Sequence, residues 1–279
     1  MSRRDQALAL RELHVPGRPL VLANVWDPGT ARVVASAGAA ALATTSAGVS
    51  WALGAPDGEG LGRDRTVELT ARVAAAVDLP VTADLEGGYG ATPEEVALSV
   101  HQVLAAGAVG INLEDGLHGS DPAYPDGTPL RTVEDAAARI AAARAAADAA
   151  GIPLFINART DLFLYRVGDP ATRVEQVLVR AAAYAEAGAD GIFVPQAPPE
   201  AIGLLASTLT LPLNVMVGPG SPTVPELAAL GVARISAGAA LALASFDTVR
   251  RAAAELFGTG TYDALAGTLN YPELNALLS

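Results

Sequence analysis

The chain has 279 residues, 51% of them hydrophobic, and its 18 basic and 30 acidic residues give a formal net charge of −12. This length is typical of one large domain with a single core. Every basic residue is Arg; there is no Lys and no Cys, and only three His are present. These absences exclude Schiff-base and pyridoxal-phosphate chemistry, a P-loop lysine, thiolate nucleophiles, thiolate zinc sites, disulfides and a His-rich metal centre.

The negative net charge also restricts the kinds of molecule that the protein can bind. No basic stripe is present that could release counterions from phosphates, so we expect no nucleic-acid partner. Asp5, Arg11 and Glu12 interrupt the apolar stretch that a signal peptide would need, and no apolar run reaches membrane-spanning length. The sequence therefore predicts a cytoplasmic protein without a membrane partner.

A short sequence pattern recurs along the chain: an Ala-rich helical stretch ends at a glycine, and an apolar run follows. The glycines are Gly38, Gly107, Gly188 and Gly231. A glycine suits the left-handed position just after a helix, so each occurrence of the pattern predicts a helix-to-strand joint. In chain order, the predicted strands lie near residues 20, 42, 82, 111, 155, 192, 214 and 234.

Eight apolar strands that alternate with helices predict an α/β fold, a (β/α)8 TIM-type barrel, rather than an open doubly wound sheet. No GxGxxG motif follows the first strand, which disfavours a dinucleotide-binding domain. We expect a single domain over 1–279, with the barrel at about 18–245 and a helical extension at about 246–279. The apolar residues of the extension pack either on a neighbouring subunit or on the chain's own barrel: Tyr262, Leu265, Leu269, Leu274, Leu277 and Leu278.

Barrel enzymes place the active site at the carboxyl ends of the strands. Asp84 and Glu86 are two residues apart at the end of one predicted strand, so their side chains are expected to share a face. Glu114 arrives on the next strand. Three carboxylates without a lysine repel one another unless a cation lies among them, and a hard ion such as Mg²⁺, or Mn²⁺, suits oxygen ligands. The alternative for any one of them is a helix cap or an ion pair with Arg.

Other polar residues follow the fifth and seventh strands. The planar fork of Arg159 can hold a substrate carboxylate, or it can form a structural ion pair with Asp161 or Glu114. Asn157 and Asn214 can donate to developing negative charge, or they can satisfy backbone groups inside the barrel.

The longest predicted loop, 116–131, follows the fourth strand and is rich in Gly and Pro. Its length suggests a lid that carries His118 or Tyr124 over the substrate as a general acid or base. A plain exposed loop is the alternative for either side chain. His14 and His101 are expected to be structural or exposed.

Five segments of the chain resemble the isocitrate lyase / phosphoenolpyruvate mutase family, in order from about residue 20 to 245. They are Thr44-Thr45-Ser46-Ala47-Gly48, Leu53-Gly54-Ala55-Pro56-Asp57, Ala83-Asp84-Leu85-Glu86-Gly87-Gly88-Tyr89-Gly90, Gly110-Ile111-Asn112-Leu113-Glu114-Asp115 and Asn157-Ala158-Arg159-Thr160-Asp161.

The resemblance implies a barrel whose eighth helix is exchanged between the subunits of a homodimer or homotetramer. It implies Mg²⁺ near Asp84, Glu86 and Glu114, with Asp57 close by. The Thr45-Ser46-Ala47 turn would hold the 2-oxo or enolate oxygen and the carboxylate of a small oxo or hydroxy acid, with Arg159 facing the same carboxylate. Members of the family break or rearrange a bond beside an enolate, which the metal stabilises.

The chain also departs from the family. Members that cleave isocitrate have a lid motif with Lys and Cys, and members that handle phosphonopyruvate have a Lys and an Asn in the lid and a His after the sixth strand. Here the lid has no Lys or Cys, and the sixth strand ends in Pro195-Gln196. The best-known activities of the family are therefore disfavoured.

The sequence leaves three functional hypotheses. The first is a Mg²⁺-dependent carbon-carbon lyase that cleaves a 2-hydroxy or 2-oxo di- or tricarboxylate by a retro-aldol or retro-Claisen step. The others are a carbon-phosphorus mutase or hydrolase acting on phosphonopyruvate-like substrates, and a non-catalytic oxo-acid-binding protein. The predicted catalytic residues are Arg159, Tyr124, His118 and Glu114; the predicted substrate-binding residues are Thr45, Ser46, Ala47, Asp84, Asn157, Arg159 and Asn214; the predicted metal ligands are Asp84, Glu86, Glu114 and Asp57.

Overall fold

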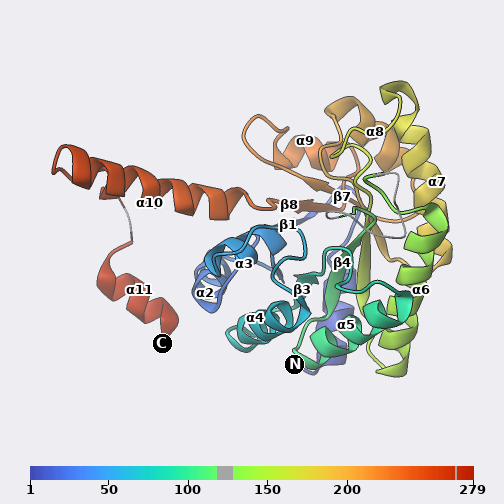
Figure 1. The fold of residues 1–279 in the computed structure, drawn as a ribbon, viewed down its shortest axis with the longest axis horizontal. Coiled ribbons are helices and arrows are strands. Elements are labelled where there is room, and N and C mark those ends of the chain that lie inside the picture. The colour runs from blue at the N-terminus through green and yellow to red at the C-terminus, as the bar shows by residue number, and fades with distance from the viewer. Residues whose placement is uncertain (118–127, 268) are drawn as a thin grey trace.

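The computed structural model describes residues 1–117, 128–267 and 269–279. Eight parallel strands form one sheet in the order β1-β8-β7-β6-β5-β4-β3-β2. A parallel bridge between Val25 and Thr44 connects the two edge strands, which closes the sheet into the predicted barrel (Figure 1). The strands are β1 Leu20–Leu22, β2 Leu42–Ala43, β3 Val81–Asp84, β4 Gly110–Glu114, β5 Phe155–Arg159, β6 Gly191–Phe193, β7 Leu213–Met216 and β8 Arg234–Ser236.

Helices precede, connect and follow the strands, and those that connect strands lie around the barrel. They are α1 Arg3–Glu12, α2 Pro28–Ser36, α3 Ser46–Ala52, α4 Arg63–Ala75, α5 Pro93–Ala105, α6 Val133–Ala149, α7 Arg173–Glu186, α8 Pro199–Thr208, α9 Val224–Ala229, α10 Ala240–Gly258 and α11 Tyr271–Leu278, with short 3₁₀ turns η1 Pro170–Thr172 and η2 Asp263–Leu265.

The local sequence explains where the helices begin and end. The N-terminal residues Thr92 and Thr223 each accept from the backbone N–H three residues later, and a glutamate at that position bonds back in a capping box. The joint glycines Gly38, Gly107, Gly188 and Gly231 have φ values of 94°, 103°, 100° and 90°. The predicted left-handed joints are therefore confirmed, and each turns the chain from a helix into the next strand.

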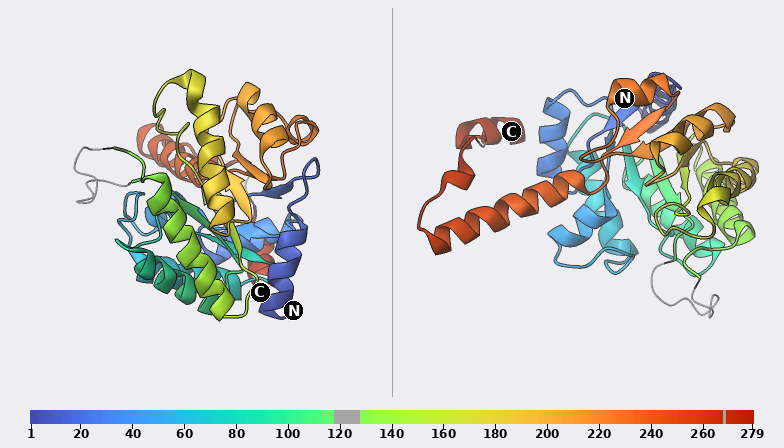
Figure 2. Two further views of the ribbon diagram at one scale, coloured as in Figure 1. Left: turned by 90° about the vertical axis from the view of Figure 1, so that its right-hand side faces the viewer. Right: turned by 90° about the horizontal axis from the view of Figure 1, so that it is seen from above.

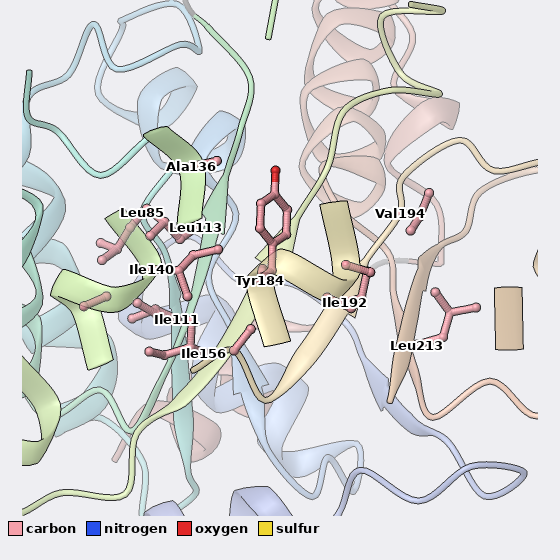
Figure 3. Close-up of a cluster of buried hydrophobic side chains, with 14 of the residues drawn as sticks. Leu85, Ile111, Leu113, Ala136, Ile140, Ile156, Tyr184, Ile192, Val194 and Leu213 are labelled. Carbon is pink, nitrogen blue, oxygen red and sulfur yellow. The ribbon is translucent and has the colours of Figure 1, made fainter. Parts of the chain in front are cut away.

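The main hydrophobic core lies between the strands and the helices that surround them (Figure 3). Ile111, Ile156 and Ile192 alternate along their strands with residues that face the barrel interior, and they are fully buried against α5, α6 and α7. Tyr184 of α7 lies in the same cluster. This packing fixes the strands whose other face carries the polar residues described below.

The amino-terminal end of the barrel is closed by α1. Leu10 is fully buried, and His14 stacks on Phe155 with 3.7 Å between the ring centroids. His14 Nδ1 lies 2.7 Å from the Leu10 carbonyl oxygen, and burial lowers the pKa of the ring to about 3, helped by the nearby Arg234 and Arg11 charges. His14 is a buried structural residue, and the open end of the barrel is the opposite one.

The C-terminal segment leaves the barrel (Figures 1 and 2). Helix α10 begins at Ala240, inside the predicted barrel range, and projects away from the sheet, while α11 turns back to contact α2. Exchange of this segment between subunits stays a prediction. Among the described residues, no helix combines the length and the apolar character that crossing a membrane requires.

Candidate active site

A pocket of about 780 Å³ opens at the carboxyl ends of the strands. It brings together several of the predicted site residues, which arrive from β2, β3, β5 and the connections after them. Asn24 and Asn112 complete its polar side. The predicted residues in the wall are Thr45, Ser46, Ala47, Asp57, Asp84 and Arg159.

Asp84 is the last residue of β3 and is 8% exposed. Its backbone N–H donates to Thr44 Oγ1 at 2.9 Å, and its Oδ2 accepts from the N–H of Ser46 at 3.2 Å. Within the described part of the chain, the buried Oδ1 atom has no hydrogen-bond partner. Asp84 therefore presents one carboxylate oxygen with unused capacity at the floor of the pocket.

Glu86 lies two residues beyond the end of β3, and the expectation that it shares a face with Asp84 stays a prediction. The strand ends at Asp84, and Glu86 has a left-handed backbone with φ of 50°, so strand alternation no longer applies. Its two oxygens accept from the Tyr89 hydroxyl and from the Glu59 N–H, both at 2.6 Å. Burial raises the pKa of Glu86 to about 7, and the charge of Asp84 adds to the rise.

Arg159 forms both ion pairs considered from the sequence. Its Nη1 lies 2.7 Å from Glu114 Oε2, and its Nε and Nη2 donate to the two oxygens of Asp161 at 2.6 and 3.1 Å. Burial opposes the charge, but the two carboxylates outweigh it and raise the pKa of Arg159. A guanidinium has five N–H donors, so donors remain for a ligand in the pocket that Arg159 lines.

A second buried network holds Asp161 in place. Asp115 Oδ1 accepts from the Asp161 N–H at 2.9 Å, and Oδ2 accepts from the Tyr184 hydroxyl at 2.7 Å and from Arg180 at 3.0 Å. The Asp115 side chain is fully buried and compensated by Arg180. The orientation of Arg159 thus depends, through Asp161, on a network anchored in the core cluster of Figure 3.

Asn157 and Asn214 form a ladder inside the barrel instead of lining the pocket. Asn157 Nδ2 donates to the side-chain oxygens of Asn112 and Asn214, both at 2.9 Å. Neither Asn157 nor Asn214 is among the described residues of the pocket wall, whereas Asn112 is. Asn157 and Asn214 therefore form hydrogen bonds inside the barrel, which was the alternative to a role in substrate binding. Asn112 is the member of the ladder that can contact a ligand.

Arg234 lies under this ladder and is fully buried. Its Nη2 donates to Asn112 Oδ1 at 3.1 Å, while Nε and Nη1 have no hydrogen-bond partner among the described residues. Burial lowers the pKa of Arg234 to about 10, and the Asp84 carboxylate opposes that fall. A buried cation therefore lies close enough to Asp84 to act on its charge.

Tyr165 lies in an irregular connection after β5, where no sequence pattern singled it out, and it is not among the described residues of the pocket wall. Its hydroxyl lies 3.4 Å from the position that a Cβ would take on Gly116, and Asp161 Oδ2 lies 2.6 Å from the same position. Burial raises the pKa of Tyr165 to about 12, and the carboxylates of Asp161 and Glu114 contribute. The phenol therefore keeps its proton at neutral pH.

His118 and Tyr124 lie outside the described residues. Across residues 1–117, 128–267 and 269–279, no group of three His, Asp or Glu side chains is arranged to hold a metal ion. Mg²⁺ is commonly held by one or two carboxylates and several waters, and the unpaired Oδ1 of Asp84 fits that mode. Direct ligation by Glu86, Glu114 or Asp57 stays a prediction.

The chain is similar to several known proteins. The family model of phosphoenolpyruvate phosphomutase matches residues 10–257. An oxaloacetate decarboxylase of Pseudomonas putida is 33% identical over 83% of this chain and 78% of its own length. A Burkholderia cenocepacia protein proposed to be a phosphonomutase is 46% identical, with a TM-score of 0.84 over 93% of this chain and all of its own. A phosphonopyruvate hydrolase in complex with oxalate and Mg²⁺ is 26% identical, with a TM-score of 0.84 over 98% of this chain and 94% of its own.

Proposed function

Because the chain belongs to the phosphoenolpyruvate phosphomutase family, we propose that it is a Mg²⁺-dependent lyase that breaks a carbon-carbon bond beside the 2-oxo group of a small carboxylate. Oxaloacetate is the first substrate to test, since relatives about one-third identical over most of both chains are oxaloacetate decarboxylases. The observation that carries the proposal is the pairing, in one pocket, of the open oxygen of Asp84 with the guanidinium of Arg159.

The residues assign an orientation to the substrate. The remaining N–H donors of Arg159 bind the carboxylate next to the 2-oxo group. The first turn of α3, at Thr45, Ser46 and Ala47, supplies hydroxyl and backbone donors to the 2-oxo oxygen. Asp84 would hold Mg²⁺, which would supply electrostatic stabilisation for the negative charge of the enolate.

Decarboxylation suits this set of residues because its first step needs no base. The bond between C3 and C4 breaks, its electron pair moves into the enolate, and carbon dioxide leaves. One proton must then be added to C3. Tyr165 is the proton donor that we propose among the described residues, because its hydroxyl lies near Asp161 Oδ2, which accepts from Arg159.

The test is steady-state release of pyruvate from oxaloacetate with Mg²⁺, measured against a protein-free blank and a chelator control. Asp84→Asn should lower kcat/KM by about 10³-fold, since it removes the charge that the site is built around. Asp148→Asn is the matched control, because the Asp148 side chain is 67% exposed on α6. A wild-type rate equal to the blank with oxaloacetate and with a panel of 2-hydroxy di- and tricarboxylates would refute the proposal.

The carbon-phosphorus alternative has a specific observation in its favour, the 46% identity to the protein proposed to be a phosphonomutase. A phosphonate dianion requires positive charge, however, and Arg159 is the only cation among the described residues of the pocket wall. Phosphorus NMR of phosphonopyruvate with Mg²⁺ and the protein tests it: new resonances would favour this second function.

We also propose that the chain forms a homodimer or homotetramer through the α10 to α11 segment. Val249 and Phe257 on α10 are 67% and 86% exposed, and Tyr271 at the start of α11 is 83% exposed. Large apolar side chains gathered on a projecting segment are typical of an interface. Sedimentation velocity should show an oligomer that Phe257→Asp dissociates, whereas Leu98→Asp on the outside of α5 should leave it intact.

A further inference from the structure

The pocket has two unlike halves. The half described above holds its charged residues, Asp57, Asp84 and Arg159. The other half lies between the β6 to α8 and β7 to α9 connections, and its wall includes the uncharged polar residues Gln196 and Ser221. Most of this wall is apolar, and we call this half the apolar chamber: Phe193, Ile202, Val215, Met216, Val217 and Leu227. Both halves belong to one continuous pocket.

Phe193 marks the boundary between the halves. The guanidinium carbon of Arg159 lies 5.6 Å from the centre of the Phe193 ring. A carboxylate bound by Arg159 therefore has the Phe193 ring beside it, and the rest of the ligand that points towards β7 enters the apolar chamber. The chamber is thus placed to contact the substituent on the carbon next to the 2-oxo group.

Charge decides what kind of substituent the chamber accepts. The described part of its wall includes no Lys, Arg or His. Arg159, the single cation among the described residues of the pocket wall, is already shared with Glu114 and Asp161. A second permanent anion in the chamber would lose its water without gaining a partner, whereas an alkyl group gains from leaving water.

We propose that the substrate is a 2-oxo acid whose C3 carries an uncharged alkyl substituent, and that the apolar chamber binds this substituent. The inference rests on the proposed function, because it takes the charged end of the substrate to lie at Arg159. The group lost on cleavage leaves from the same C3, so the product is a straight-chain 2-oxo acid longer than pyruvate.

Product binding tests this inference separately from turnover. Calorimetry with the Mg²⁺-loaded protein should show affinity rising about 4-fold per methylene from pyruvate to 2-oxobutanoate to 2-oxopentanoate, with an increasingly negative heat-capacity change. The matched anion is 2-oxoglutarate, which has the chain length of 2-oxopentanoate and a carboxylate in place of the methyl group. It should bind at least 10-fold more weakly than 2-oxopentanoate.

A variant reverses the charge preference of the chamber. Met216→Arg places a cation in its wall, so it should strengthen 2-oxoglutarate binding and weaken 2-oxopentanoate binding. Val179→Arg on α7 is the control, because Val179 is 58% exposed on a helix outside the pocket wall. It should leave the whole series unchanged.

The outcomes separate the two proposals. Affinity that is flat or falls along the alkyl series, or stronger binding of 2-oxoglutarate, would overturn the inference and would indicate that protein, such as α10 of a second copy, fills the chamber. Rising affinity without cleavage of oxaloacetate, its 3-ethyl derivative or any member of the 2-hydroxy acid panel would overturn the proposed function and leave the inference about the apolar chamber intact. Cleavage of oxaloacetate with a lower kcat/KM for the 3-ethyl derivative would count against the inference alone.

Discussion

The buried ring of His14 makes the stability of the barrel depend on pH in a predictable way. A histidine whose pKa is lower in the folded state stabilises the protein fully above its unfolded pKa, and this contribution is lost as the pH falls. With a folded pKa of about 3 and an unfolded value of 6.5, His14 alone should lower the free energy of unfolding by about 2 kcal/mol between pH 7.5 and pH 5.

The perturbation is His14→Phe, which keeps the stacking on Phe155 and cannot take up a proton. The variant loses the bond to the Leu10 carbonyl, which costs about 1 kcal/mol, so it should be less stable than the wild type at pH 7.5. At pH 5 the order should reverse, with the variant more stable by about 1 kcal/mol, since it avoids the 2 kcal/mol loss.

Urea unfolding at the two pH values, followed by the fluorescence of Trp26 and Trp51, measures both differences. The wild type should have the higher free energy of unfolding at pH 7.5, and the variant should have the higher value at pH 5. Equal differences at both pH values, or an NMR titration of the His14 ring near its unfolded pKa, would refute the reasoning.

Four further changes test other parts of the structure. Arg159→Lys keeps a charge but loses the planar fork, so kcat/KM should fall at least 10-fold in the pyruvate-release assay, mostly through KM. Tyr165→Phe should lower kcat by about 10²-fold with little change in KM, and equal kcat would assign the proton to another group. Asp115→Asn leaves the charge of Arg180 uncompensated, and urea unfolding should show a loss of about 3 kcal/mol. Arg234→Met replaces a buried cation that has two unpaired donors by apolar volume, so the free energy of unfolding should stay equal or rise; a fall above about 3 kcal/mol would contradict this.

The barrel could be predicted from the sequence because its signals are local. A glycine after a helix needs only its own backbone freedom, and Gly38, Gly107, Gly188 and Gly231 all adopt the predicted left-handed conformation. The apolar runs that follow them are the strands, because parallel strands covered by helices are buried on both faces. These signals determine where each strand begins and ends along the sequence. They therefore also indicate which residues lie at the carboxyl ends of the strands, where the site is.

The roles of the site residues were harder to predict, because they depend on backbone conformation and on partners far away in the sequence. The positive φ of Glu86 removes it from the alternation that places Asp84 in the pocket, and no residue type signals this. Asn157 uses both amide protons inside the barrel, whereas Asn112, its partner on β4, lines the pocket. The two residues are register partners on β4 and β5, so their place along the strands does not separate them; their side-chain partners do, and the sequence alone does not reveal these partners.

The absence of lysine has a structural consequence beyond the chemistry that it excludes. Two arginines near the site are held by fixed carboxylates: Arg180 by Asp115, and Arg159 by Asp161 and Glu114. A guanidinium stays charged and has a rigid fork, so these pairs keep their geometry while a substrate enters and leaves. Because the carboxylates already balance much of this positive charge, the protein has little left for new negative charge in the pocket. We therefore expect a reaction in which a metal ion at Asp84 stabilises the enolate and the protein supplies oriented hydrogen-bond donors, as in the cleavage proposed above.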